Sequence, residues 1–250
     1  MKISATIITL NEERNIERCL RSLKNVADEI IVLDSNSTDR TEEICLGHNV
    51  RFVKRDWEGY SASKNYLNSL VIHDYILSMD ADEAVDKELE QEILKVKVFD
   101  RPELYSLNRR TNYCGRWIKH SGWYPDVKTR LFPKDGCFWD GEFVHEELSY
   151  PKGSKIVQLN GHLAHYSYYS LKDHRERADK YSILTAQKMS KAGKTASTLK
   201  PFLSGFARFL TMYVIKAGFL DGRMGFKIAQ ISAQSNVFKY KELRRLNKEQ

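Results

Sequence analysis

The stretch Tyr75–Glu83, which reads YILSMDADE, constrains this chain more than any other segment. Its first half is apolar enough for a buried strand, and its second half carries a dense set of carboxylates. In an open α/β sheet, ligands bind beyond the carboxyl ends of the strands, so we expect Asp80 and Asp82 at the rim of a site. On extended backbone, their i, i+2 spacing would point both side chains the same way.

Two carboxylates that point together repel each other unless a positive partner or solvent compensates them. A divalent cation that carries a phosphate is one such partner, because Mg²⁺ is usually held by one or two carboxylates and substrate phosphates. A solvated acidic loop at a helix start is the simpler interpretation of an isolated Asp-X-Asp. The segments that precede this motif favour the cation site.

Those earlier segments alternate between strand-like and helix-like patterns. Strands are expected at 3–10, 29–33 and 50–54, with helices at about 16–23, 39–45 and 62–70. The order β-α-β-α-β-α-β predicts right-handed crossovers and an α/β fold with a mainly parallel central sheet. Polar residues follow the strands: Thr9, Asn11 and Glu12 the first, Asp34 the second, Asp80 and Asp82 the fourth. We therefore expect them to cluster at one edge of the sheet.

Asp34 alone supports two interpretations. An isolated Asp after a strand is most often the cap of its own turn. The alternative is that its carboxylate accepts hydrogen bonds from a nucleobase N–H or a ribose hydroxyl. No G-x-G-x-x-G follows the first strand and no G-x-x-x-x-G-K-[ST] occurs, which argues against a dinucleotide oxidoreductase and a P-loop NTPase.

Charge and cysteine usage limit the partners and the compartment. The net charge of +7 favours an anionic partner, which is a nucleotide, a nucleic acid or an acidic membrane. The four cysteines include no Cys-x-x-Cys pair, which indicates a reducing compartment. The sequence shows neither a secretory signal pattern nor a run of apolar residues long enough to span a bilayer. These features predict a cytoplasmic protein.

Four motifs together resemble family 2 of the inverting, GT-A-fold glycosyltransferases. They are Thr9–Glu13, Asp34–Thr41, Gly59 with Ser63-Lys64-Asn65, and Met79–Glu83, in the family's order and spacing over about the first hundred residues. The resemblance implies a GT-A fold with a helical C-terminal extension. It also implies metal-dependent transfer of a hexose from a nucleotide sugar, with inversion.

The resemblance assigns a role to each matching position. The residues implied to bind the nucleotide sugar are Thr9, Asn11, Glu12, Asp34 (at the base), Lys64 (at the diphosphate or sugar), Asp80 and Ala81. Asp82 is implied to bind Mg²⁺ or Mn²⁺ through the diphosphate, with Asp80 nearby, and oxygen ligands suit either ion. His165 is implied to complete the metal's coordination, since many GT-A sites use a later histidine. A hydrogen-bonded packing histidine is the alternative.

The family's catalytic base is an Asp or Glu on the acceptor side, at the end of a short acidic motif. Glu146, in Val144-His145-Glu146, occupies the similar position. Its rivals are Asp126, Asp140 and Glu142. The simpler interpretation of Glu146 is a surface carboxylate at a helix start.

The later part of the chain is similar to the branch of this family that adds sugars to the lipopolysaccharide inner core. The similar stretches are Asn108–Arg110, Gly122–Asp126, Thr129–Phe132, Val144–Leu148 and His165–Tyr168. This similarity implies UDP-glucose as the donor and a lipid-linked saccharide as the acceptor.

Residues 105–169 are rich in aromatic residues and short strand-like runs, including 129–132, 155–159 and 162–166. They predict an antiparallel extension of the sheet that completes the site. Trp123 is a candidate platform for a sugar ring, or else a packing residue. Arg109 and Arg130 are candidate contacts to phosphate on donor or acceptor, or else part of a solvated basic face.

We therefore expect a catalytic domain at 1–169, with its nucleotide-sugar half at 1–100 and its acceptor half at 101–169. Residues 170–250 are expected to form a basic, helical extension. The apolar run 202–220, flanked by Lys and Arg, is typical of a helix in the interface of an anionic membrane. This predicts a peripheral protein on the inner face of the cytoplasmic membrane. Packing of these helices on the catalytic domain or on a second subunit is the alternative.

The sequence argues against two other classes of protein. A sugar nucleotidyltransferase normally shows a Gly-rich, Arg/Lys-containing loop after the first strand, and Thr9–Glu13 is not such a loop. A nucleic-acid-binding module needs its positive charge gathered with aromatic residues on one face. Here carboxylates lie where a polyanion would have to approach, so no nucleic-acid partner is expected.

Overall fold

The computed structural model describes residues 1–98, 103–141 and 146–248. The chain divides into two compact units. The sheet unit contains Met1–Arg109 and Asp126–Tyr166, and the helical unit contains Arg110–Pro125 and Ser167–Gln250. This division differs from a boundary at residue 169, because residues 110–125 and 167–169 cluster with the helices.

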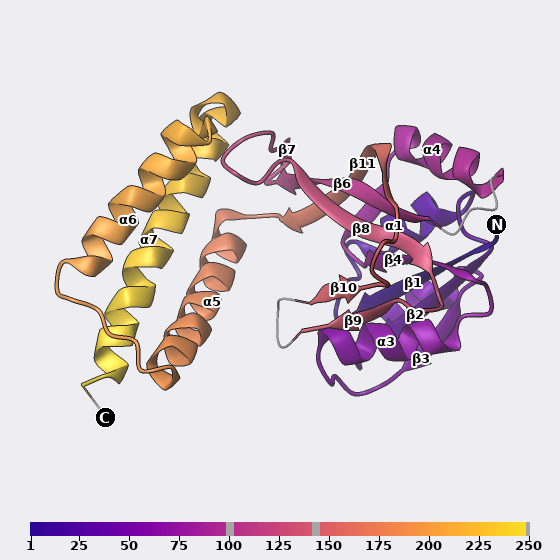
Figure 1. Cartoon of the computed structure of the whole chain (residues 1–250), viewed down its shortest axis with the longest axis horizontal. Helices are drawn as coiled ribbons and strands as arrows, with labels where there is room; N and C mark the ends of the chain where they lie inside the picture. Colours follow the sequence, from indigo (N-terminus) through magenta and orange to yellow (C-terminus); the bar gives the residue numbers. More distant parts are fainter. Residues whose placement is uncertain (99–102, 142–145, 249–250) are drawn as a thin grey trace. The chain divides into compact units, whose positions relative to one another are not determined.

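The first half of the sheet unit alternates strands and helices, as predicted. The elements are β1 (Ile3–Thr9), α1 (Ile16–Leu23), β2 (Glu29–Asp34), α2 (Thr41–Leu46), β3 (Arg51–Lys54), α3 (Tyr60–Leu70) and β4 (Tyr75–Asp80). β1 pairs in parallel with both β2 and β4, and β2 pairs in parallel with β3 (Figure 1). All seven residues of β1 are buried, because a central parallel strand is covered on both faces.

The second half extends the same sheet with antiparallel strands, which confirms the predicted α/β fold with an antiparallel extension. Its elements are β5 (Glu83–Val85), α4 (Lys87–Val98), β6 (Leu104–Tyr113), β7 (Arg116–Trp117), β8 (Asp126–Pro133), β9 (Phe138–Asp140), β10 (Glu147–Ser149) and β11 (Ile156–Tyr168). β8 pairs antiparallel with β4 and with β6. The strand order is β3-β2-β1-β4-β8-β6-β11-β5, with β7 beside β6, and β9 pairs separately with β10.

One expectation about this half was wrong. The runs 155–159 and 162–166 are not two strands but belong to the single strand β11. Gly161, which lies between them, has a φ of +84°. A Cβ atom there would lie 2.2 Å from the backbone nitrogen of Leu89 in α4, so glycine lets the strand continue past the start of that helix.

The core lies on both faces of the sheet. On one face, Ile3 and Ile7 of β1 pack with Leu20 of α1 and Ile93 of α4. A second cluster packs α3 and Trp139 against residues of β2, β4 and β8. The register aligns Thr9 with Asp34 and Ile8 with Asp80, so the carboxyl ends of β1, β2 and β4 meet at one edge.

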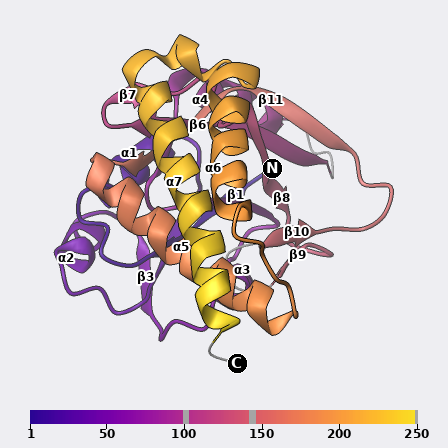
Figure 2. The same cartoon turned by 90° about the vertical axis from the view of Figure 1, so that its left-hand side faces the viewer.

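The helical unit contains α5 (Leu171–Lys191), α6 (Lys200–Leu210), a π-helical turn (Thr211–Ile215), a 3₁₀ turn (Gly218–Asp221) and α7 (Gly222–Leu246). α5 begins at a capping box, in which Ser170 and Asp173 each accept the other's backbone N–H. Figures 1 and 2 show α5 and α6 alongside α7. In the described part of the chain, no single helix has the length and apolar character needed to cross a membrane. The helical segments Lys200–Ile215 and Gly218–Leu246 are bent by 72° relative to each other. Taken together, they have the required length and apolar character.

Trp123 belongs to an aromatic cluster in the helical unit. Its ring stacks on Tyr168 with centroids 5.6 Å apart, and it meets Tyr113 and His174 edge-on. The Tyr113 hydroxyl lies 2.8 Å from His174 Nδ1. The structure therefore gives Trp123 a packing role, and its contact with an acceptor sugar stays a prediction.

This cluster leads to an expected pH dependence of stability. Burial of His174, together with the nearby charges of Arg177 and Arg175, lowers its pKa to about 4. An unfolded histidine has a pKa of about 6.5, so between these values the unfolded chain binds more protons than the folded chain. We expect the free energy of unfolding to decrease, by at most about 1.4 kcal/mol per pH unit from this group, as pH falls from about 6.5 to 4.

Urea denaturation across this pH window is the measurement. His174→Gln should flatten the decrease, and His48→Gln, in the loop after α2, should leave it as in the wild type. An unchanged slope in His174→Gln would show that another group causes the pH dependence.

Candidate active site

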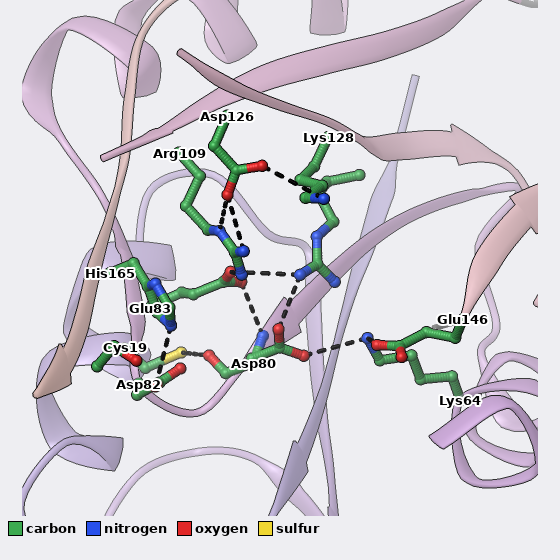
Figure 3. Close-up of polar contacts among 12 residues, drawn as sticks. Cys19, Lys64, Asp80, Asp82, Glu83, Arg109, Asp126, Lys128, Glu146 and His165 are labelled. Carbon is green, nitrogen blue, oxygen red and sulfur yellow. Dashed lines mark hydrogen bonds and ion pairs between the residues drawn. The ribbon is translucent and has the colours of Figure 1, made fainter. Parts of the chain in front are cut away.

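Asp80, the last residue of β4, lies between two cations. Its Oδ2 is 2.7 Å from Arg130 Nη2, and its Oδ1 is 3.2 Å from Lys64 Nζ. Lys64 comes from α3 and Arg130 from β8, and both side chains are buried. The structure thus brings together three residues that the sequence placed at the site. In Figure 3, Asp80 occupies the centre of the polar network.

Glu83 holds this arrangement together, although the sequence alone assigns it no role. Its side chain is completely buried. Its Oε1 accepts hydrogen bonds from Arg109 and Arg130, both at 3.3 Å, and its Oε2 accepts the backbone N–H of Asp80 at 2.9 Å. The available signal was its place as the last acid of the motif Met79–Glu83.

The charges in this cluster shift the pKa values of two carboxyls. Burial would raise the pKa of Asp80, but the charges of Arg130 and Lys64 outweigh burial and hold it well below its usual range. Burial also opposes ionisation of Asp126, yet the Arg109 guanidinium, 2.8 Å away, lowers its pKa. A carboxylate with a lowered pKa is a weak proton acceptor, which makes Asp126 a poor candidate for the base.

Glu146 lies beside the same lysine. Its Oε1 is 3.1 Å from Lys64 Nζ, so this ammonium is shared between Glu146 and Asp80 (Figure 3). The Glu146 side chain is partly exposed. Asp140 is exposed in β9 and accepts the backbone N–H of Gly141. The remaining rival, Glu142, lies outside the described residues.

The predicted metal ligands do not all converge. Ala81 and Asp82 form a turn between β4 and β5, so the expectation that Asp80 and Asp82 point the same way on extended backbone was wrong. Asp82 Oδ2 instead lies 3.2 Å from His165 Nε2, while Asp80 faces the cations (Figure 3). The pairing of β11 with β5 aligns His165 with Glu83 and so brings the imidazole to Asp82.

Two of the three predicted metal ligands, Asp82 and His165, are therefore neighbours. Within residues 1–98, 103–141 and 146–248, no three His, Cys, Asp or Glu side chains gather as a complete metal site. A carboxylate and an imidazole still fit a cation whose other ligands are diphosphate oxygens and water, which is the usual arrangement for Mg²⁺ with a substrate phosphate. The donor set fits a cation that arrives with its nucleotide.

Buried donors without partners point to an anionic ligand. Arg130 Nε and Nη1 and the Thr9 hydroxyl are buried and have no hydrogen-bond partner among the described residues. Leaving such a group unpaired costs about 1–3 kcal/mol, and more when it is charged. Phosphate oxygens are strong acceptors for a guanidinium. Arg130 and Thr9 are therefore suited to a phosphate-bearing ligand at this edge.

The loops after β1 and β2 are tied to each other. The backbone N–H of Asn11 donates to the Ser37 hydroxyl, and that of Glu12 donates to the Thr41 hydroxyl, both at 2.8 Å. Asp34 is fully buried and accepts both the backbone N–H and the hydroxyl of Ser37. Asp34 thus caps its own turn, and its contact with a nucleobase stays a prediction, as do the nucleotide contacts of Asn11, Glu12 and the buried Ala81.

Removing Arg130 should destabilise the protein strongly. Arg130→Met leaves the buried carboxylate of Glu83 and the partly buried carboxylate of Asp80 without their shared cation, and breaking a buried pair such as Arg130–Glu83 costs about 3–5 kcal/mol. Urea denaturation followed by circular dichroism measures this loss. Lys128→Met is the matched control, because Lys128 pairs with Asp126 at an exposed position and should cost less than about 1 kcal/mol. Equal losses in both variants would contradict the stabilising role of Arg130.

Comparisons with known proteins identify the family. The family model described as "Glycosyl transferase family 2" matches residues 4–149. An uncharacterized glycosyltransferase of Rickettsia typhi is 31% identical, over 98% of this chain and 88% of the relative. The lipopolysaccharide core biosynthesis glycosyltransferase LpsC of Rhizobium meliloti is 28% identical, over 93% of this chain and 88% of LpsC.

Among solved structures, S. aureus TarS 1–349 in complex with UDP-GlcNAc aligns with a TM-score of 0.49 and 15% identity, over 100% of this chain and 92% of TarS 1–349. The assignment itself depends on the family model, which spans more than half of this sequence, and on the Rickettsia relative, which aligns over nearly all of it. The chain belongs to glycosyltransferase family 2 and is an enzyme that transfers a sugar from a nucleotide-sugar donor.

Proposed function

We propose that this enzyme is a metal-dependent, inverting hexosyltransferase that moves glucose from UDP-glucose to a lipid-linked saccharide such as the lipopolysaccharide inner core. The observation that carries the proposal is the position of Lys64 between Asp80 and Glu146. The lysine joins a nucleotide-binding strand end to a partly exposed carboxylate from the later part of the chain.

Departure of the nucleotide requires neutralisation of the charge that develops on its diphosphate. Asp82 and His165 would hold the Mg²⁺ or Mn²⁺, which supplies part of this neutralisation when bound. An imidazole ligand is less typical of Mg²⁺, which prefers oxygen, so this pair favours Mn²⁺. The unpaired Nε and Nη1 of Arg130 would donate to phosphate oxygens from within the protein.

Inversion requires a proton acceptor on the face of the sugar opposite the diphosphate. Glu146 would take the proton of the acceptor hydroxyl as the new C–O bond forms and the bond to the diphosphate breaks. Lys64 would hold the Glu146 carboxylate in place through their 3.1 Å contact. Asp80 supports this arrangement, because its other oxygen is fixed by Arg130.

The proposed acceptor and location have two supports. The relative LpsC is named for lipopolysaccharide core biosynthesis, and such an acceptor is anchored in a membrane. The helical unit exposes large apolar side chains on and after α6: Phe202, Leu203, Phe206, Val214 and Ile215. We therefore place the enzyme at the inner face of the cytoplasmic membrane, as a peripheral protein.

A donor screen tests the proposed reaction. The protein is incubated with UDP-sugars and GDP-sugars, with Mn²⁺, with Mg²⁺ or with EDTA, and release of the nucleotide diphosphate is measured. We expect hydrolysis of UDP-glucose above that of the other donors, and its loss in EDTA. Release that is equal in EDTA would contradict the metal-dependent mechanism, and a preference for a GDP-sugar would contradict the proposed donor.

A further inference from the structure

A groove lies between α6 and α7, within the helical unit. It has a volume of about 460 Å³, and its lining includes Lys200, Leu203, Ser204, Arg208 and Asn236. The two helices run alongside each other in both views of the fold (Figures 1 and 2). Gly205 permits this approach, because a Cβ atom there would lie 2.5 Å from Val237 Cγ2.

Three cations gather at this groove. Lys200 and Arg208 line it, and Lys239 of α7 lies close to both. The ammonium groups of Lys200 and Lys239 lie 5.6 and 4.7 Å from the ring centroid of Tyr240. In the described part of the chain, none of the three cations forms an ion pair.

The electrostatics agree with this geometry. Burial lowers the pKa of Lys239, and the charges of Arg208 and Lys200 lower it further. The three cations therefore repel one another in the free protein. A bound anion would relieve this repulsion.

Hydrogen bonds fix the polar groups of the groove. Lys239 Nζ donates to Asn236 Oδ1 at 2.9 Å, and Asn236 Nδ2 donates to the Ser204 hydroxyl at 3.2 Å. This chain of contacts runs from α7 to α6 and orients Lys239. The groove is thus a built polar site rather than a scatter of surface lysines.

An apolar stripe lies next to this groove on α6. Phe202, Leu203 and Phe206 are 57%, 63% and 65% exposed, and Leu210 continues the stripe one turn later. Their spacing places them on one side of the helix. Leu203 belongs to both the stripe and the groove lining. An occupant must therefore offer negative charge and apolar surface side by side, as the interface of an anionic bilayer does.

We propose that the groove binds the phosphate headgroup of an anionic membrane lipid while the apolar stripe of α6 inserts among the acyl chains. This inference rests on the proposed function only in its biological purpose, which is to hold the enzyme at the surface where a lipid-linked acceptor resides.

Vesicle co-sedimentation of the full chain tests this proposal. Vesicles of phosphatidylcholine alone are compared with vesicles that also contain phosphatidylglycerol. We expect the wild type to pellet with the anionic vesicles. The triple variant Lys200→Gln, Arg208→Gln, Lys239→Gln should bind about a hundredfold more weakly, since each cation near an anionic surface contributes about a factor of five.

The matched control removes three other cations from the same unit. The triple variant Lys188→Gln, Lys191→Gln, Lys194→Gln loses the same charge from exposed positions at the end of α5 and beyond it. We expect it to retain most of the binding. An equal loss in both triple variants would overturn the groove as the site and leave general charge attraction. Phe206→Ser should also weaken vesicle binding, because it removes an apolar side chain from the stripe.

Two results would assign the groove to another occupant and overturn the proposal. Calorimetric binding of inorganic phosphate to the groove, without pelleting on vesicles, would assign it to free phosphate. A wild type that is dimeric in light scattering, with a monomeric Phe206→Ser that pellets normally, would assign the stripe to a second copy. Metal-dependent donor hydrolysis, measured in parallel, should be intact in every variant. Its absence from the wild type would instead contradict the proposed reaction.

Discussion

Replacing Glu146 by glutamine should abolish sugar transfer while nucleotide binding persists. The amide cannot accept the proton of the acceptor hydroxyl, and loss of a general base typically costs about 10²–10⁴-fold in rate. Lys64 keeps its 3.2 Å contact with Asp80, so the nucleotide side of the site should remain in place. Initial rates with a lipid-linked acceptor and calorimetric titration with UDP in Mn²⁺ measure the two properties separately.

The neighbouring residue is the control for this variant. Glu147 is exposed at the start of β10, so Glu147→Gln makes the same chemical change one position away and should retain the wild-type rate. Turnover of Glu146→Gln near that of the wild type would show that another group is the base. Loss of UDP binding in Glu146→Gln would show that the residue shapes the nucleotide site instead.

Asp82→Asn should remove metal-dependent donor binding. Mutating residues that only orient a metal ligand already costs about 10–100-fold in metal affinity, so losing the charge of a ligand should cost about a hundredfold or more. His165 would then be the one remaining ligand of this pair, and one imidazole is too few to hold the cation without the carboxylate. The measurement is calorimetric titration with Mn²⁺ in the presence of UDP, together with the rate of donor hydrolysis.

The chain offers a closely matched control for Asp82. Asp86 and His162 form a second Asp–His pair in the sheet unit, with Oδ2 and Nδ1 3.3 Å apart. Asp86 also accepts the backbone N–H of Leu89 at the start of α4, so its role is structural. Asp86→Asn should leave Mn²⁺ affinity unchanged. If the two variants lose the same affinity, or if neither loses any, Asp82 is not the metal ligand.

The sequence predicts the scaffold and the location of the site well, because both depend on local patterns. The apolar run before Asp80 and the alternation of strands with helices require the carboxyl ends of β1, β2 and β4 to meet. This pattern places Asp80 at that edge, and the resemblance to family 2 adds Lys64. The motif spacing that identified the family lies in this same segment.

The details of the site depend on tertiary pairing that local patterns do not contain. Asp80 and Asp82 diverge because a turn starts at Ala81. The i, i+2 spacing of two acids is the same in a turn as in an extended strand, so it does not reveal the turn. Glu83 is buried because it is the first residue of β5. The local sequence does not reveal β5, which forms a strand through its pairing with β11. The same pairing brings His165 to Asp82 from more than eighty residues away.

The roles of aromatic and basic residues are the hardest to predict from the sequence. The sequence makes Trp123 a candidate platform for a sugar ring, yet in the structure its ring stacks in a packing cluster of the helical unit. The sequence makes Arg109 and Arg130 candidate phosphate contacts, and in the structure both form ion pairs with Glu83. A side chain's type does not reveal which internal partner it will find.

The central claim is that Asp82, with His165 beside it, holds a cation that carries the nucleotide diphosphate to the ends of β1, β2 and β4. Crystals grown with UDP and Mn²⁺, and measured at the manganese absorption edge, test it most directly. We predict an anomalous peak at coordination distance from Asp82 Oδ2 and from a diphosphate oxygen. Bound UDP with no manganese peak beside Asp82 would contradict the claim.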